Sequence, residues 1–405
     1  MMGSLPRLSP TSMLNDIMCL LMTGGVVGKT TAWKQTRAGR RRDRRRTRRL
    51  GIARTKRAVW LDQMDHIRAI APRKLHPHTE HSDKKRFVRT ITPPAVLDLE
   101  ENYEATIALL KNIRFATRTL NAKFMIELKA VREISPAAAL LMVAECDRWR
   151  EKTRQKWLRA VDAALWVPSV RRRLKEMGFF EVLRTRNVPQ DTYAAGEDRY
   201  VPFLTGTRNV GQPAKDLRTS IEGLGLTIVD SPALYDGLVE AMTNVTQHAY
   251  AAPDGSEAQR WWISASVNTS LNRMTVMVVD HGAGIARTLP RSTKWELIRQ
   301  VVGPTLLKDD AKLLEAAFSV EGGNRSQTGE DYRGKGLRDN IKGYVEAHES
   351  RGHLHVIANH GRYRFQRDSR TGVEKEASSH LAAEFNGTFI EWVIEDYGHQ
   401  PNNDH

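Results

Sequence analysis

The sequence is poor in cysteine and has no long apolar run. Its 405 residues include two cysteines, Cys19 and Cys146, which excludes a framework of several disulfide bonds and is typical of a reducing compartment. A membrane-spanning helix needs about 20 apolar residues, and the longest clean run, 136–146, is far shorter. Near the N-terminus, Asn15 and Asp16 interrupt the apolar core that a signal peptide requires. We therefore expect a cytoplasmic protein with no membrane partner.

Positive charge is concentrated near the N-terminus. The formal net charge is +16, and the run Arg37–Arg57 holds twelve Lys or Arg residues against one acid, Asp43. Like charges at this density repel one another, so we expect residues 1–90 to form a basic, largely unstructured region. The run is either a solvated tail or a site for an anionic partner, of which nucleic acid is the first candidate. Because Trp33 and Trp60 are the only aromatic residues near it, such binding would be non-specific in sequence.

Strand and helix patterns alternate between residues 93 and 185 and predict a small α/β domain. The spacing predicts helices at 102–120, 136–149 and 170–183 and strands at 124–131 and 157–165. The order resembles a STAS domain, the module that partners ATP-binding kinases in anti-sigma-factor circuits. Ser135 lies near the position where such domains carry a phosphorylated serine, but Ile134 stands where they have Asp. Ser135 also suits the N-cap of the helix that follows it.

The C-terminal half is organised around a helix predicted at Ser231–Tyr250. A Ser-Pro pair at its start suits an N-cap and a first turn. Glu240, Asn244 and His248 lie four residues apart and therefore share one polar face. A solvated face is the alternative interpretation of these three residues. An apolar stripe on the same helix consists of Leu234, Leu238, Met242 and Val245.

Three glycine-containing motifs follow in order along the chain. The β-branched run Met274–Val279 predicts a buried strand that leads into the first motif. Each motif alone is a weak signal because Asp and Gly are ordinary turn residues. The motifs are Asp280-His-Gly282-Ala-Gly284-Ile285, then Gly334-Lys335-Gly336-Leu337 directly after Arg333, and finally Asn386-Gly387-Thr388.

The ordered set ExxxNxxxH, DxGxGI, GxGL and GT resembles the GHKL superfamily, which includes gyrase, the Hsp-ninety chaperones, histidine kinases and mismatch-repair ATPases. The resemblance covers about 231–395. It implies a Bergerat fold, a two-layer α/β sandwich whose mixed sheet carries helices on one face. We therefore expect an ATP-binding GHKL domain at 230–396, preceded by a linker at 186–229 and followed by a tail at 397–405.

The residue types at these positions suit ATP and Mg²⁺. The amide oxygen of Asn244 is a ligand for hard Mg²⁺, and the carboxylate of Glu240 can orient and deprotonate a nucleophile. Asp280 at a strand end offers an acceptor to the exocyclic amine of adenine, where guanine presents a carbonyl group. By resemblance, Thr388 supports the adenine pocket through its hydroxyl group or a bridging water. His248 either reaches phosphate or packs against its neighbours.

Glycine serves two purposes in the proposed pocket. Gly282 and Gly284, which precede Ile285, let the backbone approach the base and the ribose. Gly334 and Gly336 are expected in conformations that alanine resists, with their N–H groups at the start of a helix from Leu337, an anion site. The neighbouring cations are Arg333 and Lys335, and the polar segment 321–331 is expected to form a mobile lid.

ATP binding leaves the reaction open. None of the 13 histidines stands on a long helix in the setting of a phosphoacceptor, which disfavours a conventional sensor histidine kinase. The presence of Glu240 favours an ATPase, or a switch in which ATP changes homodimerisation or a protein partner. A second alternative is a protein serine kinase of the anti-sigma-factor type, acting on a STAS partner or on its own STAS-like domain. A third is a nucleic-acid-associated protein in which ATP only sets the conformation.

Overall fold

The computed structural model describes residues 88–395 except for gaps at 120–122, 154–157, 194–195, 208–209, 227, 229–230, 248–259, 293, 321–335 and 349. These residues belong to one compact unit, Lys84–His405. Several predictions concern residues outside this part of the chain. They are those for the basic region up to residue 87 with its run Arg37–Arg57, the segment 321–331, the tail 397–405, and the site residues His248, Arg333, Gly334 and Lys335.

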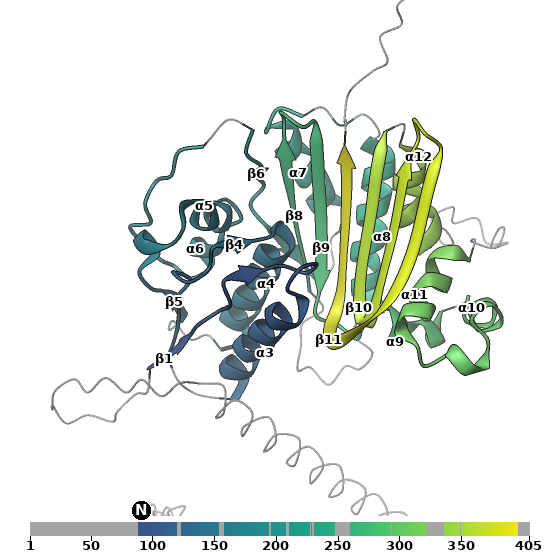
Figure 1. The fold of residues 1–405 in the computed structure, drawn as a ribbon, viewed down its shortest axis with the longest axis horizontal. Coiled ribbons are helices and arrows are strands. Elements are labelled where there is room, and N and C mark those ends of the chain that lie inside the picture. The colour runs from purple at the N-terminus through teal and green to yellow at the C-terminus, as the bar shows by residue number, and fades with distance from the viewer. Residues whose placement is uncertain are drawn as a thin grey trace, which may run out of the picture. The chain divides into compact units, whose positions relative to one another are not determined.

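The first part of the described chain alternates strands and helices, as the sequence predicts (Figure 1). One parallel sheet has the strand order β1-β3-β5, and a second parallel pair joins β2 to β4. The helix expected at 170–183 is broken at Gly178, whose φ of 90° favours glycine. The elements are β1 (Val88–Ile91), β2 (Val96–Leu97), α3 (Tyr103–Thr119), β3 (Lys123–Ile126), β4 (Glu133–Ile134), α4 (Pro136–Thr153), β5 (Leu158–Ala160), α5 (Pro168–Glu176) and α6 (Phe179–Val182).

A larger sheet of six strands forms the centre of the second part. Its strand order is β10-β11-β9-β8-β6, and β7 also pairs with β8. Every one of these pairs is antiparallel, which differs from the mixed sheet that we expected. The strands are β6 (Arg199–Tyr200), β7 (Leu204–Gly206), β8 (Trp261–Asn268), β9 (Arg273–Asp280), β10 (Arg351–Asp368) and β11 (Val373–Glu395).

The helices around this sheet include the predicted one, which begins at Ser231. Segment 186–229, which we expected to be a linker, contains β6, β7 and an additional helix, α7. The segment after Gly336 starts as a π-helix over Leu337–Lys342 and continues as α12. The helices are α7 (Gly211–Glu222), α8 (Ser231–Gln247), α9 (Ile285–Thr288), α10 (Trp295–Val302), α11 (Asp310–Ser319) and α12 (Gly343–Ala347).

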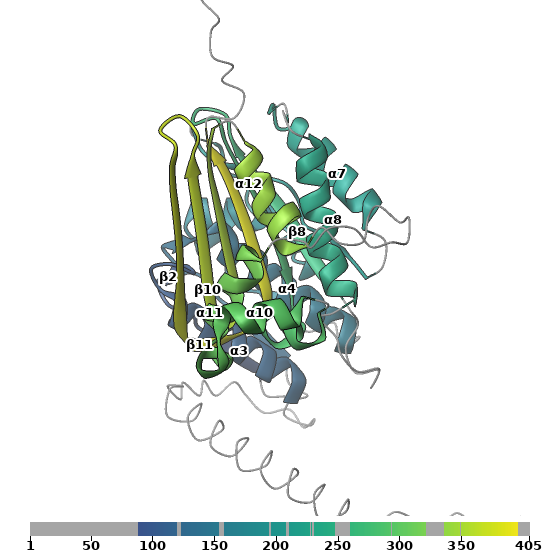
Figure 2. The same cartoon turned by 90° about the vertical axis from the view of Figure 1, so that its right-hand side faces the viewer.

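Helices cover both faces of the six-stranded sheet, whereas we expected them on one face (Figures 1 and 2). All eight residues of β8 are buried, because successive side chains enter two different cores. Trp261, Ile263, Val276 and Val278 pack in the core that contains α8, α11 and α12. Trp262, Met277, Val279 and Phe389 pack in the core that contains α3 and α4.

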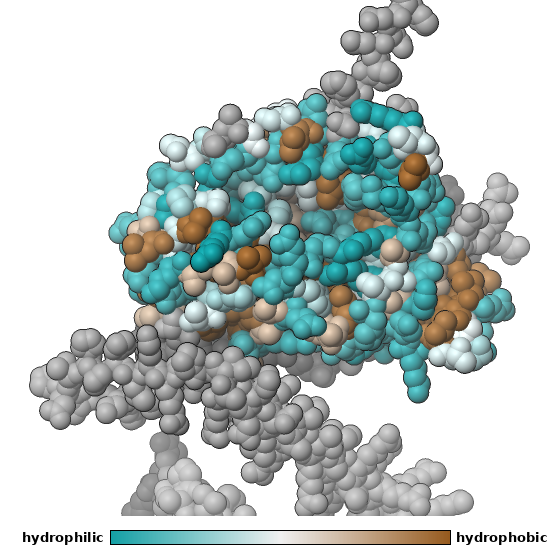
Figure 3. Space-filling model, in the orientation of Figure 1, coloured by the Kyte–Doolittle hydropathy of each residue, from teal (hydrophilic) through white to brown (hydrophobic). Residues whose placement is uncertain are grey.

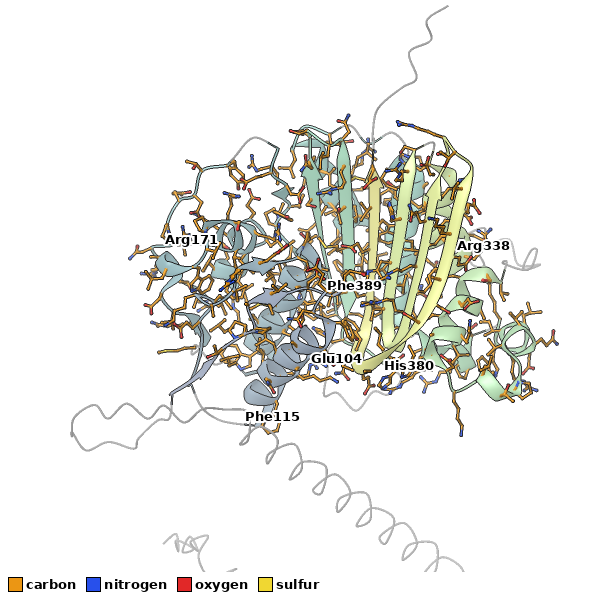
Figure 4. All side chains as sticks on the ribbon, viewed as in Figure 1. Glu104, Phe115, Arg171, Arg338, His380 and Phe389 are labelled. Atoms are coloured by element: carbon orange, nitrogen blue, oxygen red, sulfur yellow. The ribbon has the colours of Figure 1, made fainter. Side chains whose placement is uncertain are left out.

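The second core joins the two parts of the unit. Figure 4 shows Phe389 in the sheet close to α3, and this side chain is fully buried. Burying a side chain of this size stabilises the fold by about 1.5–3 kcal/mol. A hydrogen bond of 2.9 Å from Tyr103 Oη to the carbonyl oxygen of Ala383 adds a direct link between α3 and β11. The α3–α4 layer, defined here as these two helices, is therefore part of the same packed structure as the sheet.

The surface visible in Figure 3 is mostly hydrophilic. An apolar patch lies over α10, where Leu297 and Val301 are exposed, with Leu306 just beyond the helix. Within the described residues, no helix combines the length and the apolar character needed to cross a membrane.

Candidate functional site

The carboxyl group of Asp280 is buried at the C-terminal end of β9. Its Oδ1 accepts a 2.6 Å hydrogen bond from the N–H of Gly282, and the hydroxyl and N–H of Thr388 also bond to the carboxyl group. Burial raises the pKa of Asp280 from 3.8 to about 7, although the hydrogen bonds from Gly282 and Thr388 oppose the rise. The hydrogen bonds from Gly282 and Thr388 therefore offset only part of the cost of burying a negative charge on Asp280.

Two of the predicted glycine motifs lie against each other at this end of the sheet. The pairing of Phe389 with Val279 brings Gly387 beside Asp280. Gly387 has φ of 114°, and a Cβ on it would lie 2.7 Å from the carbonyl carbon of Asp280. Only glycine fits this position, because the φ is left-handed and the space is filled by backbone. The structure thus brings together Asp280, Gly282 and Thr388 as the sequence motifs predict.

Asn359 holds the rest of the Asp280–Gly284 loop and was missed by our reading of the sequence. Its Nδ2 donates a 2.7 Å hydrogen bond to the carbonyl oxygen of Ala283. A Cβ on Gly284, whose φ is 85°, would lie 2.7 Å from that Nδ2. Asn359 itself has φ of 56°, a conformation that Asn tolerates. A single Asn inside an apolar strand pattern carries no signal that would have identified it.

Ile285 is the first residue of α9, which packs against α11 and β10. Ile285 is buried in the core that contains α8, and Leu337 packs against the same core. Ile285 follows the DxGxG motif and Leu337 follows the GxG motif. Both residues therefore lie on the face of the sheet that α8 covers.

Glu240 and Asn244 lie one turn apart on α8 and contact each other. Asn244 Nδ2 donates a hydrogen bond of 3.2 Å to Glu240 Oε1. Burial raises the pKa of Glu240, while hydrogen bonds with Asn244 and Asn340 and the charge of Lys294 lower it. Because Nδ2 faces Glu240, Oδ1 is the atom of the Asn244 amide that can bind a cation.

The backbone after Gly336 packs against the same helix. A Cβ on Gly237 of α8 would lie 3.0 Å from the carbonyl oxygen of Asn340. Gly336 has φ of −103° and ψ of −160°, an extended conformation open to alanine, so our expectation of a glycine-only conformation is wrong at this residue. A Cβ on Gly336 would lie 2.8 Å from Lys294 Nζ. Lys294, which the motifs did not indicate, therefore sets a positive charge beside the start of Leu337–Lys342.

No family model and no curated protein matches this chain. Its function must therefore be inferred from the residues and their geometry.

Proposed function

We propose that this chain is a Mg²⁺-dependent ATP-binding protein of the GHKL type, acting as an ATPase or as a conformational switch driven by ATP. The observation that carries the proposal is the buried carboxyl group of Asp280, held at a strand end by Gly282 and Thr388. An ionised carboxylate there accepts a hydrogen bond from the exocyclic amine of adenine. Guanine would oppose it with a carbonyl oxygen, so the site would select ATP over GTP.

The donor set suits a metal ion that arrives with phosphate. Among the described residues, no group of three or more His, Cys, Asp or Glu side chains surrounds a metal position. Mg²⁺ in nucleotide sites needs only one or two protein ligands, and the amide oxygen of Asn244, whose Nδ2 bonds to Glu240, can supply one. When bound, Mg²⁺ neutralises charge on the phosphates.

Glu240 is the residue that we propose as general base. It is half-buried, its pKa is raised by burial, and its hydrogen bond to Asn244 fixes one carboxylate oxygen. A raised pKa moves a carboxylate towards neutral pH, where general-base catalysis is most efficient. This environment favours phosphoryl chemistry over a role in which ATP is only a conformational ligand.

The cytoplasm, which the low cysteine content indicates, is a reducing compartment that supplies ATP.

The test uses γ-labelled ATP, Mg²⁺ and the full-length protein, and follows both free phosphate and label on the protein. We expect release of free phosphate, with a loss of about 10²–10⁴-fold in Glu240→Gln. Glu222→Gln, on the exposed face of α7, is the matched control and should keep the wild-type rate. Stable label on the protein would support the serine-kinase alternative instead. No binding of ATP at millimolar concentration would refute the proposal.

A further inference from the structure

The Asp280–Gly284 loop has a second contact, on the face of the sheet opposite α8. His281 directly follows Asp280 and is buried, with its ring centroid 5.1 Å from that of Trp262. Val279 packs with the α3–α4 layer and Val278 with α8, so strand alternation directs Asp280 towards the α8 side. The side chain of His281 contacts the α3–α4 layer. Two consecutive residues thus connect the proposed adenine acceptor to a different layer of the fold.

Three side chains form a closed cluster at this contact. Arg114 of α3 donates from Nε to Glu145 Oε1 of α4 at 2.8 Å. Its Nη2 also bonds to Glu145 and lies 2.9 Å from Nδ1 of His281. His281 Nε2 lies 3.4 Å from Glu145 Oε1. Each member of the cluster therefore contacts the other two.

The charges in the cluster fix the orientation of His281. Burial opposes ionisation of Glu145, but the charges of Arg114 and Arg148 and the hydrogen bond from Arg114 hold its pKa below the ordinary value. Burial lowers the pKa of His281 to about 3, against the opposing effect of Glu145. At neutral pH, Glu145 is therefore an anion balanced by Arg114 and Arg148, and His281 is neutral. Its Nδ1 accepts from Arg114, which leaves the proton on Nε2, an atom that lies near Glu145 but makes no hydrogen bond with it.

We propose that Glu145 and Arg114 are positioning residues for the Asp280–Gly284 loop, so that ATP binding is coupled to docking of the α3–α4 layer. This inference rests on the proposed function. The backbone at His281 has little freedom, since a Cβ on Gly387 would lie 2.8 Å from His281 Cα. A shift of α4 would therefore move Asp280 as well. Coupling between two binding events is reciprocal, so ATP must in turn favour the docked layer.

The chain contains a matched control and a reporter for this coupling. Asp147, two residues after Glu145 on α4, accepts a 2.9 Å hydrogen bond from Nε1 of Trp262 and thereby ties the same helix to β8. Cys146 lies between them and is fully buried. Burial raises the pKa of its thiol, which suppresses its reactivity. Labelling of Cys146 therefore reports departure of α4 from the sheet.

The first experiment compares ATP affinity by calorimetry in Glu145→Gln and Asp147→Asn. We expect Kd to rise at least about tenfold in Glu145→Gln and to stay within about twofold of wild type in Asp147→Asn. A folded Glu145→Gln protein with wild-type affinity would overturn the proposal. So would an equal loss in both variants, because that would show a general effect of destabilising α4.

The second experiment needs no change in the cluster and stands even where Glu145→Gln does not fold. The full chain carrying Cys19→Ser is labelled with a maleimide, with and without Mg-ATP, at urea concentrations well below the unfolding transition. We expect Mg-ATP to slow labelling of Cys146 at least about fivefold, with no slowing in Asp280→Asn. ATP binding seen by calorimetry without any slowing would overturn the coupling alone. Absence of ATP binding would instead overturn the proposed function, and the coupling with it.

Discussion

Gly387 packs so closely on Asp280 that a Cβ at position 387 would overlap the carbonyl oxygen of Asp280. The contact joins the C-terminal end of β9 to β11. Two motifs that lie more than 100 residues apart in the sequence are therefore neighbours in the structure. The aspartate and the threonine of the proposed adenine pocket are therefore held by backbone packing as well as by hydrogen bonds.

We expect Gly387→Ala to lower the free energy of unfolding by about 2–6 kcal/mol. The substitution combines a left-handed φ with overpacking, each of which costs about 1–3 kcal/mol. Gly372→Ala is the control, because Gly372 has φ of 67° with no atom near its Cβ position. The free energy of unfolding of Gly372→Ala should fall only by the cost of the left-handed backbone conformation, about 1–2 kcal/mol. Urea denaturation of both variants measures the difference, and equal losses would contradict the close packing at Gly387.

Asp280→Asn should weaken ATP binding at least about tenfold. Loss of a hydrogen bond to a charged group costs about 1.5–3 kcal/mol, and 1.4 kcal/mol corresponds to a factor of ten in Kd. Isothermal titration with ATP measures the change, and circular dichroism confirms that the variant is folded. Unchanged affinity in a folded variant would remove Asp280 from the adenine pocket.

Asp280 should also make stability depend on pH. Its pKa is about 7 in the folded protein and 3.8 as its ordinary value, so between these values the folded state binds the extra proton. The contribution of Asp280 to stability therefore falls as pH rises from about 4 to 7, by at most about 1.4 kcal/mol per pH unit. The Asp280→Asn variant lacks this titrating group. The difference in free energy of unfolding between the variant and wild type should therefore rise in favour of the variant from about pH 4 to 7, and level off above pH 7. Urea denaturation at pH 5, 6, 7 and 8 tests this, and a pH-independent difference would argue against a buried, protonated Asp280.

Gly336→Ala should impair binding of ATP more than binding of ADP. The added methyl group displaces the ammonium group of Lys294 and leaves the backbone unstrained, because position 336 is extended. A displaced positive charge matters more for a triphosphate than for a diphosphate. Lys294→Met should reproduce the pattern, and titrations with both nucleotides measure it. Equal losses for ATP and ADP in both variants would exclude contact with the terminal phosphate.

The basic run Arg37–Arg57, outside the described residues, is expected to bind nucleic acid through phosphate. Engagement of about six phosphates gives a slope near −5 in log K against log salt for duplex DNA. Deletion of residues 1–60 should abolish this binding and leave ATP affinity intact. DNA binding by the deletion variant at full strength would show that the run is only a solvated tail.

Periodic patterns predicted most of the elements, because local spacing determines them. Predicted helices at 102–120, 136–149 and 231–250 coincide with α3, α4 and α8 within a few residues. Helix α7 was missed because Gly211 and Pro213 obscure its apolar positions, Ala214, Leu217 and Ile221.

The motifs likewise located Asp280, Gly282 and Thr388, which the structure brings together. Partners that reach the site from distant segments carry no local signal. Asn359 contacts the loop from β10, and Glu145 does so from α4. Lys294 is a single lysine in an irregular segment, so only its position beside Gly336 reveals it.

The burial of β8 and β9 on both faces of the sheet has a consequence for expression of fragments. Trp262, Met277, Val279 and Phe389 are kept from water by α3 and α4, which come from the chain before residue 154. A fragment that begins at residue 230 would contain all the nucleotide motifs and lack that cover. It would expose a broad apolar face, and such faces drive association between molecules. The segment that carries the motifs is therefore not expected to remain monomeric when it is produced alone.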